Sequence, residues 1–277
     1  MLAVRPDTFV IEKPLNAFTE ASTPVNMTKA ITQHAALCDE VNAHVVFPPH
    51  AKLPDIVFTA NAGLLLPRLP QHIILLSSMK HASRAKETPY IQKYLKELGI
   101  KTILFPKKEV FEGQGECKWF YEGKLLVVGY GFRSTATTIP LLQRVLNKVY
   151  LEHNVTPPKV VGIEMASPEF YHLDLAMAAI GSSVCVAHRH AFKNPLELEK
   201  WVNVRWMDTK DPFVLNMLVL KNRIVTHKLM YKKDKRWLEK VTGKPVIEVD
   251  VSEFEKSGGS VRCMILDFGR HDDHLLL

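Results

Sequence analysis

The chain has 277 residues, of which 47% are hydrophobic and 23% are charged, and this composition is typical of a folded globular protein. Only 13 Gly and 17 Pro are present, which excludes a collagenous or linker-dominated chain. The 36 Lys and Arg exceed the 29 Asp and Glu, so the net charge is +7 and the protein is mildly basic. An excess of positive charge is compatible with an anionic partner, and the length allows one large domain or two small ones.

Four cysteines are spread along the chain, at positions 38, 117, 185 and 263. No two of them have the spacing of a zinc ribbon or a redox pair, and a disulfide scaffold is not expected in a chain of this length. The N-terminal residues lack the continuous apolar core of a signal peptide, and the longest apolar stretch, Leu175 to Ala187, is shorter than the roughly 20 residues that span a bilayer. We therefore expect a cytoplasmic protein with free thiols and no membrane partner.

Short β-rich runs alternate with longer helical patterns along the whole chain. Strands are predicted at residues 45–47, 55–59, 73–77, 102–105, 125–129, 160–163, 183–188, 213–220, 223–226, 246–249 and 261–268. Helical periodicity predicts five helices, at residues 27–41, 89–98, 140–153, 195–202 and 234–241. No linker rich in Gly, Ser or Pro interrupts the series, so we predict one α/β domain over residues 1–277. The spacing of the helices, at roughly 50 residues, indicates a repeated strand-and-helix module.

The densest basic stretch is Lys228 to Lys240, where lysines lie beside Tyr231 and Trp237. A nucleic-acid surface would combine basic and aromatic residues in this way. Leu238 and Val241 in the same stretch have the spacing of a buried helix side, so we favour a solvated helix face over a nucleic-acid partner.

The sharpest chemical feature is a Gly-rich turn, Ser257 to Ser260, that leads to Cys263. Two glycines allow the backbone to approach a ligand closely, and a cysteine just beyond such a turn is placed to attack it. The alternative for Cys263 is burial as a small hydrophobic side chain.

A nucleophilic cysteine needs a proton acceptor that later becomes a donor, normally a histidine. The chain has 12 histidines, and His172 differs from the rest because an apolar run follows it and Asp174 lies two positions on. In an extended segment these two side chains would point to the same side. A core histidine bonded to a backbone carbonyl is the alternative. Two further histidine pairs lie at positions 188 and 190 and at positions 271 and 274. Their charged surroundings predict that they lie on the surface, and we expect no metal at them.

Two more segments concentrate polar residues. Residues 111–116 place Glu112 and Glu116 around glycines, and such carboxylates are good partners for a planar cation such as a guanidinium. Residues 54–63 end an apolar run in Asn61, close to a glycine. A structural turn would have the same composition, so structure and function both stay open for each segment taken alone.

Taken together, these motifs resemble the guanidine-modifying superfamily, which includes arginine deiminases, dimethylarginine dimethylaminohydrolases, amidinotransferases and arginine dihydrolases. The matching segments follow one another in family order, at residues 15–18, 58–63, 111–113, 129–134, 172–174, 258–259 and 263. The resemblance implies the pentein fold, an α/β five-bladed propeller with the active site on its central axis. It also implies no cofactor and a small guanidine partner, arginine or methylated arginine, while a homo-oligomer stays open.

The resemblance also implies roles for individual residues. Cys263 is similar to the family's nucleophile, His172 to its acid and base, and Glu112 to the carboxylate that orients this histidine. Asp174 and Glu116 match the carboxylates that hold guanidinium nitrogens. The other implied substrate-binding residues are Asn16, Asn61, and the carboxylate anchors Arg84 and Arg133.

Asn61 bears on the reaction, because deiminases commonly carry Asp in the corresponding motif, and the form found here resembles the arginine dihydrolases. We therefore expect a cysteine-dependent hydrolase that forms a covalent thiouronium intermediate and converts arginine to ornithine, carbon dioxide and ammonia. The alternatives are a citrulline-forming dimethylargininase or deiminase, and a non-catalytic protein that binds a guanidine or a nucleic acid. Glu116 stands where the family usually has Asp, and Ala17 and Phe18 replace Pro and Trp, which leaves the pocket shape and the substrate open.

Overall fold

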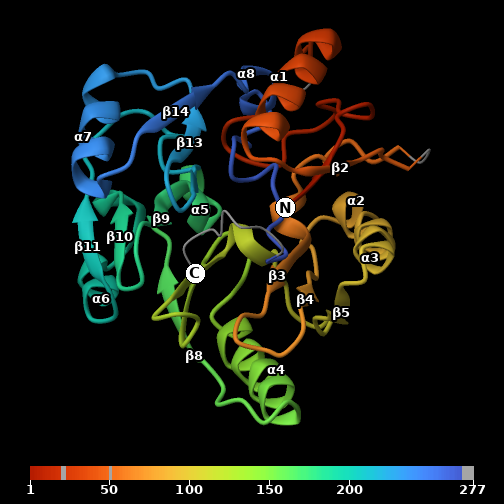
Figure 1. Ribbon diagram of the computed structural model, residues 1–277, viewed down its shortest axis with the longest axis vertical. Coiled ribbons are helices and arrows are strands. Elements are labelled where there is room, and N and C mark those ends of the chain that lie inside the picture. The colour runs from red at the N-terminus through yellow and green to blue at the C-terminus, as the bar shows by residue number, and fades with distance from the viewer. Residues whose placement is uncertain (20–22, 50–51, 270–277) are drawn as a thin grey trace.

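Five small sheets make up the β-structure of the part of the chain described by the computed structural model, residues 1–19, 23–49 and 52–269 (Figure 1). One sheet pairs β1 (Leu2–Val4) with β2 (His44–Val46). The other four sheets have three strands each: β3 (Gly63–Leu65), β4 (Ile73–Leu76) and β5 (Lys101–Leu104); β6 (Cys117–Phe120), β7 (Leu125–Tyr130) and β8 (Lys159–Glu164); β9 (Met177–Ala179), β10 (Val184–Ala187) and β11 (Asn203–Trp206); β12 (Leu218–Val219), β13 (Ile224–His227) and β14 (Val246–Val249).

Each three-stranded sheet repeats one pattern. Its middle strand pairs antiparallel with the strand before it and parallel with the strand after it. A parallel pair needs a long crossover, and a helix lies in every one: α3 (Thr88–Glu97), α4 (Thr138–Glu152), α6 (Pro195–Glu199) and α7 (Lys232–Thr242).

The two ends of the described chain complete a fifth copy of this pattern. Helix α1 (Met27–Glu40) connects the parallel strands β1 and β2, and Leu266 pairs antiparallel with Leu2. The five predicted helices and the repeated strand-and-helix module are therefore confirmed, although α6 is shorter than predicted. Shorter helical turns connect the modules: α2 (Ala82–Ala85), α5 (Leu173–Ala176), α8 (Ser252–Glu255), and the 3-10 turns η1 (Thr59–Ala62), η2 (Gly113–Gly115), η3 (Pro168–Phe170) and η4 (Arg189–Ala191).

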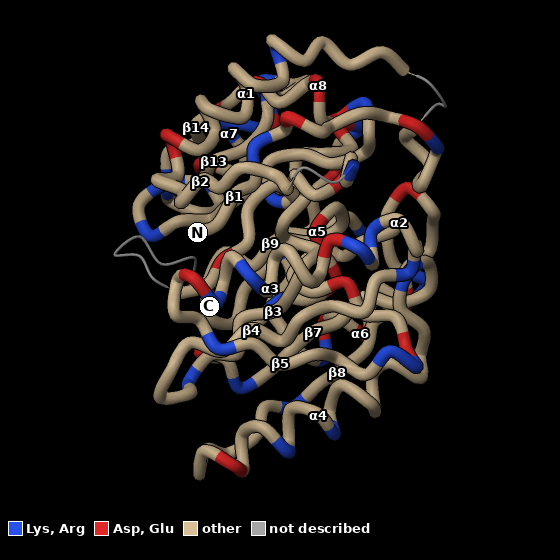
Figure 2. The backbone as a smooth tube through the Cα atoms, turned by 90° about the vertical axis from the view of Figure 1, so that its right-hand side faces the viewer, with Lys and Arg blue, Asp and Glu red and all other residues tan. Residues whose placement is uncertain are grey.

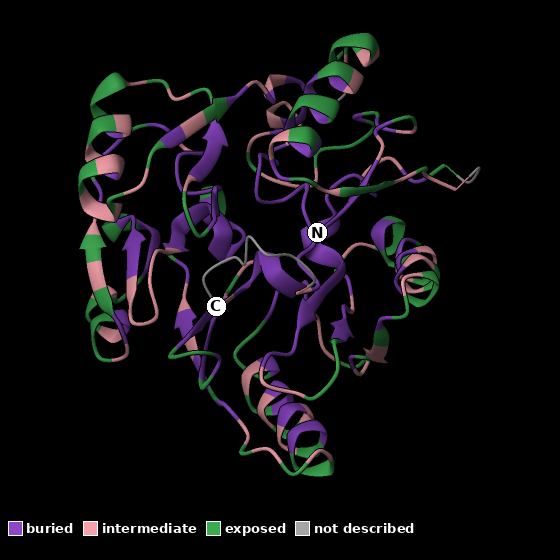
Figure 3. Cartoon of the chain, in the orientation of Figure 1, coloured by how far each residue is buried: buried purple, intermediate pink, exposed green. Residues whose placement is uncertain are grey.

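Alternate residues of β1, β4, β7, β10 and β13 enter two different hydrophobic clusters, because successive side chains of a strand point to opposite faces. In β4, Leu75 packs in the cluster of α4, whereas Ile74 packs in the cluster of α3. In β1, Leu2 packs in the cluster of α3 and Ala3 in the cluster of α1. Within the described residues, each sheet thus shares one cluster with the sheet before it and one with the sheet after it. The buried strands lie inside and the exposed residues gather on the helices around them (Figure 3). The architecture is a mixed α/β fold.

Three predicted strands are wrong over most of their length. Residues 55–58 form turns that lead into η1, residues 213–217 form turns before the two-residue β12, and residues 261–264 form turns before the isolated bridge at Leu266. The extended geometry predicted for residues 172–174 is also wrong, because only His172 is extended and α5 begins at Leu173. Since apolar turns and apolar strands have similar composition, periodicity could not separate them.

Helix α7 confirms the amphipathic pattern of the basic stretch. Leu238 is buried, and Trp237 and Val241 pack against the same cluster. Lys and Arg are mixed with Asp and Glu over the side of the molecule that faces the viewer in Figure 2. All four cysteines are unpaired and buried. Within the ranges described, no helix combines the length and the apolar character needed to cross a membrane.

Candidate active site

A narrow cavity of about 30 Å³ brings together segments from the whole length of the chain. Its lining includes six of the nine predicted site residues: Asn16, Asn61, Arg84, Arg133, His172 and Cys263. The other lining residues are Leu15, Asp55, Phe58, Tyr171, Ser257 and Gly259. Glu112, Glu116 and Asp174 are fully or almost fully buried behind this lining. We call the cavity the active-site pocket.

Cys263 is held in a network of polar side chains beside this pocket. Its Sγ accepts a hydrogen bond from Asn216 Nδ2 at 3.2 Å and lies 3.5 Å from Asp174 Oδ2. Asn216 Oδ1 in turn accepts from the main-chain N–H groups of Arg262 and Cys263, at 2.9 and 3.2 Å. Burial and the charge of Asp174 raise the pKa of the Cys263 thiol to about 12, although Asn216 opposes the shift. Without a bound cation, the sulfur is therefore a neutral thiol.

His172 forms a buried pair with Glu112. It occupies the position just before α5, and its Nε2 lies 2.7 Å from Glu112 Oε2. Burial disfavours the charged form of Glu112, but His172 and Arg133 outweigh burial and hold the pKa of this carboxyl well below its usual range. The main-chain N–H of Lys80 donates to the other carboxylate oxygen at 2.9 Å. Glu112 thus fixes the orientation of the imidazole and keeps Nδ1 free of this pair, as a proton carrier requires.

Two buried polar atoms of the site have no hydrogen-bond partner within the described chain, Asp174 Oδ1 and Asn61 Nδ2. Asp174 is fully buried in the first turn of α5, with its other oxygen directed toward Cys263. Asn61 Oδ1 accepts from Arg84 Nη1 at 2.9 Å, which determines the orientation of the amide and leaves Nδ2 as an unpaired donor. Buried polar groups are normally satisfied, so these two atoms indicate a site suited to a polar ligand.

Arg84 is held in a network that differs from the predicted role of a carboxylate anchor. Its Nε and Nη2 donate to the two oxygens of Glu87 at 3.1 and 3.0 Å. Nη2 also donates to the main-chain carbonyls of Asp55 and Phe58. With Asn61 as the partner of Nη1, all three nitrogens are engaged, and the guanidinium positions Asn61.

Arg133 and Asn16 join the N-terminal segment to the site. Arg133 donates to the main-chain carbonyl of Leu15 at 3.0 Å and to Glu112 at 3.3 Å, and its guanidinium lies 4.8 Å from the ring centre of Tyr171. Asn16 Nδ2 donates to the carbonyl of Ser257 at 2.9 Å. These contacts place residues 15 and 16 against the Gly-rich turn and make them part of the pocket wall.

Glu116 lies behind Glu112. Its Oε2 accepts from the main-chain N–H of Glu112 at 2.7 Å, and its Oε1 accepts from that of Ser134 at 2.8 Å. Burial raises the pKa of Glu116. The carboxylate that was expected to hold a guanidinium nitrogen therefore organises the loops that carry Glu112 and Arg133.

Sequence reasoning missed three residues that build the site, Asn216, Tyr171 and Asp55. Asn216 was hidden in the predicted strand 213–220, and its signal was that it is the one polar residue of that run. Tyr171 donates from its hydroxyl to the carbonyl of Gly258 at 2.6 Å. Burial raises the pKa of the Asp55 carboxyl, which contributes an acidic group to the lining.

The surface prediction for the paired histidines is wrong in one case. His188 is only 1% exposed, because the imidazole packs beside Phe170 with ring centres 5.4 Å apart. His190 is exposed as predicted, and His271 and His274 lie outside the described residues.

Comparison with known proteins agrees with this arrangement. The sequence matches the family model described as "N,N dimethylarginine dimethylhydrolase, eukaryotic" over residues 4–270. The bifunctional arginine dihydrolase/ornithine cyclodeaminase ArgZ of Synechocystis is 27% identical over 96% of this chain and 37% of its own length, and AgrE of Nostoc is 26% identical over 94% and 36%. The chain thus spans little more than a third of these two relatives. The crystal structure of the N-terminal domain of ArgZ, covalently bound to a reaction intermediate, is 27% identical, with 96% of each chain covered and a TM-score of 0.83.

The fold and the motif order confirm the predicted membership of the guanidine-modifying superfamily. Within it, the chain belongs to the N,N dimethylarginine dimethylhydrolase family, whose model extends over nearly the whole sequence.

Proposed function

We propose that the protein is a hydrolase that uses Cys263 to attack the guanidinium carbon of arginine or a close derivative. The observation that carries this proposal is the unpaired Asp174 Oδ1 in a buried site where the other oxygen of the same carboxylate faces the thiol. A carboxylate in this position receives N–H donors of a planar cation and holds its carbon beside the sulfur.

The bound cation also activates the nucleophile. Burial keeps the Cys263 thiol protonated, and a guanidinium bound against both Sγ and Asp174 supplies the positive charge that stabilises the thiolate, so that the thiol proton passes to His172. Sγ then forms a bond to the guanidinium carbon, His172 delivers the proton to the departing nitrogen, and the C–N bond breaks to release ammonia or an amine. The thiouronium that remains is hydrolysed by water, with His172 as the base, and the free thiol is restored.

Asn61 favours the dihydrolase reaction over one that stops at citrulline. The first hydrolysis turns the cationic guanidinium into a neutral ureido group that carries an oxygen acceptor. Asn61 Nδ2 is an unpaired donor, whereas a carboxylate at this position would accept hydrogen bonds only. The pocket is therefore suited to hold the ureido group for a second attack, so that arginine and two waters give ornithine, carbon dioxide and two ammonia molecules. The similarity to the N-terminal domain of ArgZ, described as an arginine dihydrolase, supports this order of preference.

Incubation of the protein with arginine and with asymmetric dimethylarginine, followed by separation of ornithine from citrulline, tests the proposal. We expect ornithine from arginine, no product with Cys263→Ser, and a shift toward citrulline with Asn61→Asp. Citrulline as the only product of the wild type would favour the second candidate, the dimethylargininase activity for which the family model is named. A wild type that binds guanidines without turning over any of them would indicate a binding protein.

We also propose that residues 1–277 form one domain in which the five modules close into a five-bladed α/β propeller. The shared hydrophobic clusters support this arrangement, because the sheet of β1 shares one cluster with β4 and another with β13. The first sheet thus contacts both the second and the last sheet, as closure of the five modules requires. The active-site pocket draws residues from the first and the last modules, which agrees with a site on the axis. The buried, unpaired cysteines support a cytoplasmic location.

A further inference from the structure

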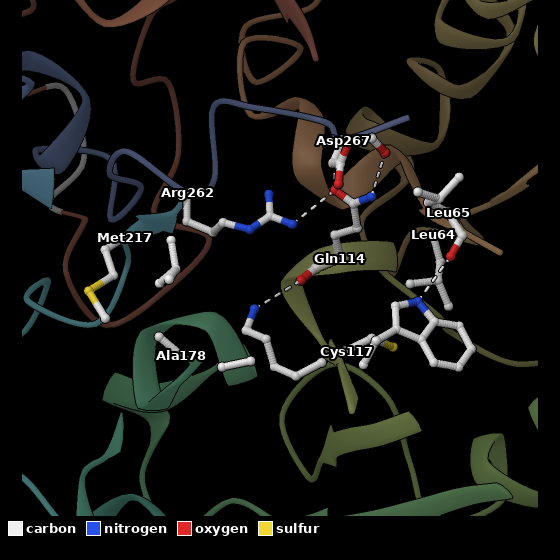
Figure 4. Close-up of a pocket in the computed structure, with 12 residues that line it drawn as sticks. Leu64, Leu65, Gln114, Cys117, Ala178, Met217, Arg262 and Asp267 are labelled. Atoms are coloured by element: carbon white, nitrogen blue, oxygen red, sulfur yellow. Dashed lines mark hydrogen bonds between the residues drawn. The ribbon is translucent and has the colours of Figure 1, made fainter. Parts of the chain in front are cut away.

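A second cavity, of about 70 Å³, is lined by Arg262 and shares no lining residue with the active-site pocket (Figure 4). It exceeds the roughly 10–15 Å³ that one water molecule requires, and it has room for a small ion only. Arg262, the residue before Cys263, reaches this cavity from one side, and Gln114 faces it (Figure 4). The full lining is Leu64, Leu65, Gln114, Cys117, Lys118, Trp119, Ala178, Ala179, Met217, Val219, Arg262 and Asp267. We call it the rear cavity.

Two cationic side chains meet in the rear cavity with few partners. Arg262 donates from Nη1 to the carbonyl of Ile265 at 2.6 Å and from Nη2 to Gln114 Oε1 at 2.9 Å. The Lys118 ammonium has one long contact, 3.4 Å to the carbonyl of Gln114. Neither cation forms an ion pair with a carboxylate of the described chain. Burial and the charge of Arg262 lower the pKa of Lys118 to about 8, and burial lowers that of Arg262. Both shifts indicate positive charge that the protein only partly compensates.

Two carboxylates act on the cations of this cavity without forming an ion pair with them among the described residues. Asp267 lines the cavity, and its Oδ1 accepts from the main-chain N–H of Gly269 at 2.9 Å. Asp267 acts electrostatically on Arg262, and Asp174 acts on both Lys118 and Arg262 while its Oδ2 is directed toward Cys263. A small anion is the ligand that this combination of donors lacks.

We propose that the rear cavity binds a small inorganic oxyanion, phosphate or bicarbonate, between Lys118 and Arg262. The free ammonium protons and the unshared N–H groups of the guanidinium supply its hydrogen bonds, and Gln114 holds the guanidinium in place.

Occupancy of this site is coupled to the active-site pocket through Asp174, a step that rests on the function proposed above. A substrate guanidinium that binds Asp174 removes the negative charge that partly compensates Lys118 and Arg262. The anion then binds more tightly, and by reciprocity the anion increases affinity for the cationic substrate. Arg262 and Cys263 both donate their main-chain N–H groups to Asn216 Oδ1, so the two sites also share a rigid support.

Trp119 lines the rear cavity and provides a direct probe of the resting protein. We expect inorganic phosphate to change tryptophan fluorescence in a saturable way, with sodium chloride at matched ionic strength as the blank. Lys118→Met should weaken binding by about tenfold or more, the loss expected for a charge-assisted hydrogen bond, and Lys118→Arg should largely restore it. Lys124→Met removes an exposed lysine in the turn of the same β6–β7 hairpin, and this variant should bind the anion as the wild type does. The same titration with bicarbonate identifies the preferred anion. The absence of saturable binding of either anion, or equal affinities for Lys118→Met and the wild type, would overturn the site.

The coupling is measured separately, in the Cys263→Ser protein with arginine present and absent. Arginine should lower the apparent dissociation constant of the anion. An unchanged constant while arginine demonstrably binds would refute the coupling and leave the anion site intact. Failure of arginine to bind at all would count against the proposed function. It would leave the anion site untouched, since the anion titration of the resting protein is carried out without arginine.

Discussion

Asn216 is expected to control both the position and the reactivity of the nucleophile. The change Asn216→Leu keeps a similar volume but removes an acceptor and a donor. The main-chain N–H of Arg262 retains a second acceptor, the carbonyl of Asn216 at 3.2 Å. The main-chain N–H of Cys263 loses its acceptor, Asn216 Oδ1, and Sγ loses its donor. One orphaned buried donor costs about 1–3 kcal/mol, so we expect the free energy of unfolding to fall by that amount. The lost hydrogen bond also raises the pKa of the thiol further, since the Asn216 amide is one of the groups that lower it.

Two measurements separate these effects. Urea unfolding gives the stability loss, and alkylation of Cys263 by iodoacetamide as a function of pH, followed on its own peptide by mass spectrometry, gives the thiolate population. A matched control is Gln143→Leu, because this amide also accepts from a main-chain N–H, that of Val160 at 2.8 Å, and donates to the carbonyl of Pro158. The control should lose stability without a change in Cys263 alkylation. Wild-type alkylation and wild-type turnover in Asn216→Leu would refute the role assigned to this residue.

Two other substitutions test the surroundings. Gly115→Ala would place a Cβ 2.3 Å from Asn61 Nδ2, so we expect loss of turnover and about 1–3 kcal/mol lower stability by thermal unfolding. The control is Gly181→Ala, whose Cβ would have its nearest atom at 3.9 Å and which should behave as the wild type. Equal activity of the two variants would contradict this packing. His227 is a pH-dependent contributor to stability: burial lowers its pKa, but the neighbouring carboxylates, including Asp211 at 3.0 Å, outweigh burial and raise it to about 9 from 6.5. Because the folded state holds the proton more tightly, this contribution of about 3 kcal/mol is complete below pH 6.5 and is lost as pH rises through 9. Urea unfolding at pH 6 and pH 9.5 should show that loss in the wild type and much less of it in His227→Gln.

Regular periodicity made most of the fold predictable. The five crossover helices have clear apolar faces, and each parallel strand pair flanks one of them, so the repeated module followed from their order. The very short strands were not predictable, because a run such as Met177–Ala179 has too few residues to establish a period of two. Of the three apolar segments predicted as strands but folded as turns, two contain Asn216 and Cys263, and the third leads directly into η1, which carries Asn61. In these segments the backbone forms turns where polar atoms must face the site, and hydrophobic periodicity along the sequence does not reveal this.

The sequence motifs predicted that Cys263, His172 and Glu112 converge, and the structure brings these residues together. The motifs could not assign which charged groups neutralise one another. Motif spacing fixes which segments converge, whereas pairing depends on side-chain directions in three dimensions. Arg84 was expected to face a substrate carboxylate, yet Glu87, three residues later on the same turn, engages it. Glu116 was expected to face a guanidinium, yet the main-chain N–H groups of two neighbouring loops engage it.

This pairing explains how a protein with a net charge of +7 forms a pocket for a cation. Both arginines of the pocket already have carboxylate partners, since Arg84 pairs with Glu87 and Arg133 with Glu112. Besides these pairs, the site holds the carboxyl of Asp55 in its lining and that of Asp174 beside Cys263, where one oxygen of Asp174 is unsatisfied. The pocket is thus locally acidic where the guanidinium would lie, while most of the basic excess lies on exposed side chains that screening by salt separates from the site. The chemistry of the ligand follows from the unpaired groups of the site rather than from the charge of the whole chain.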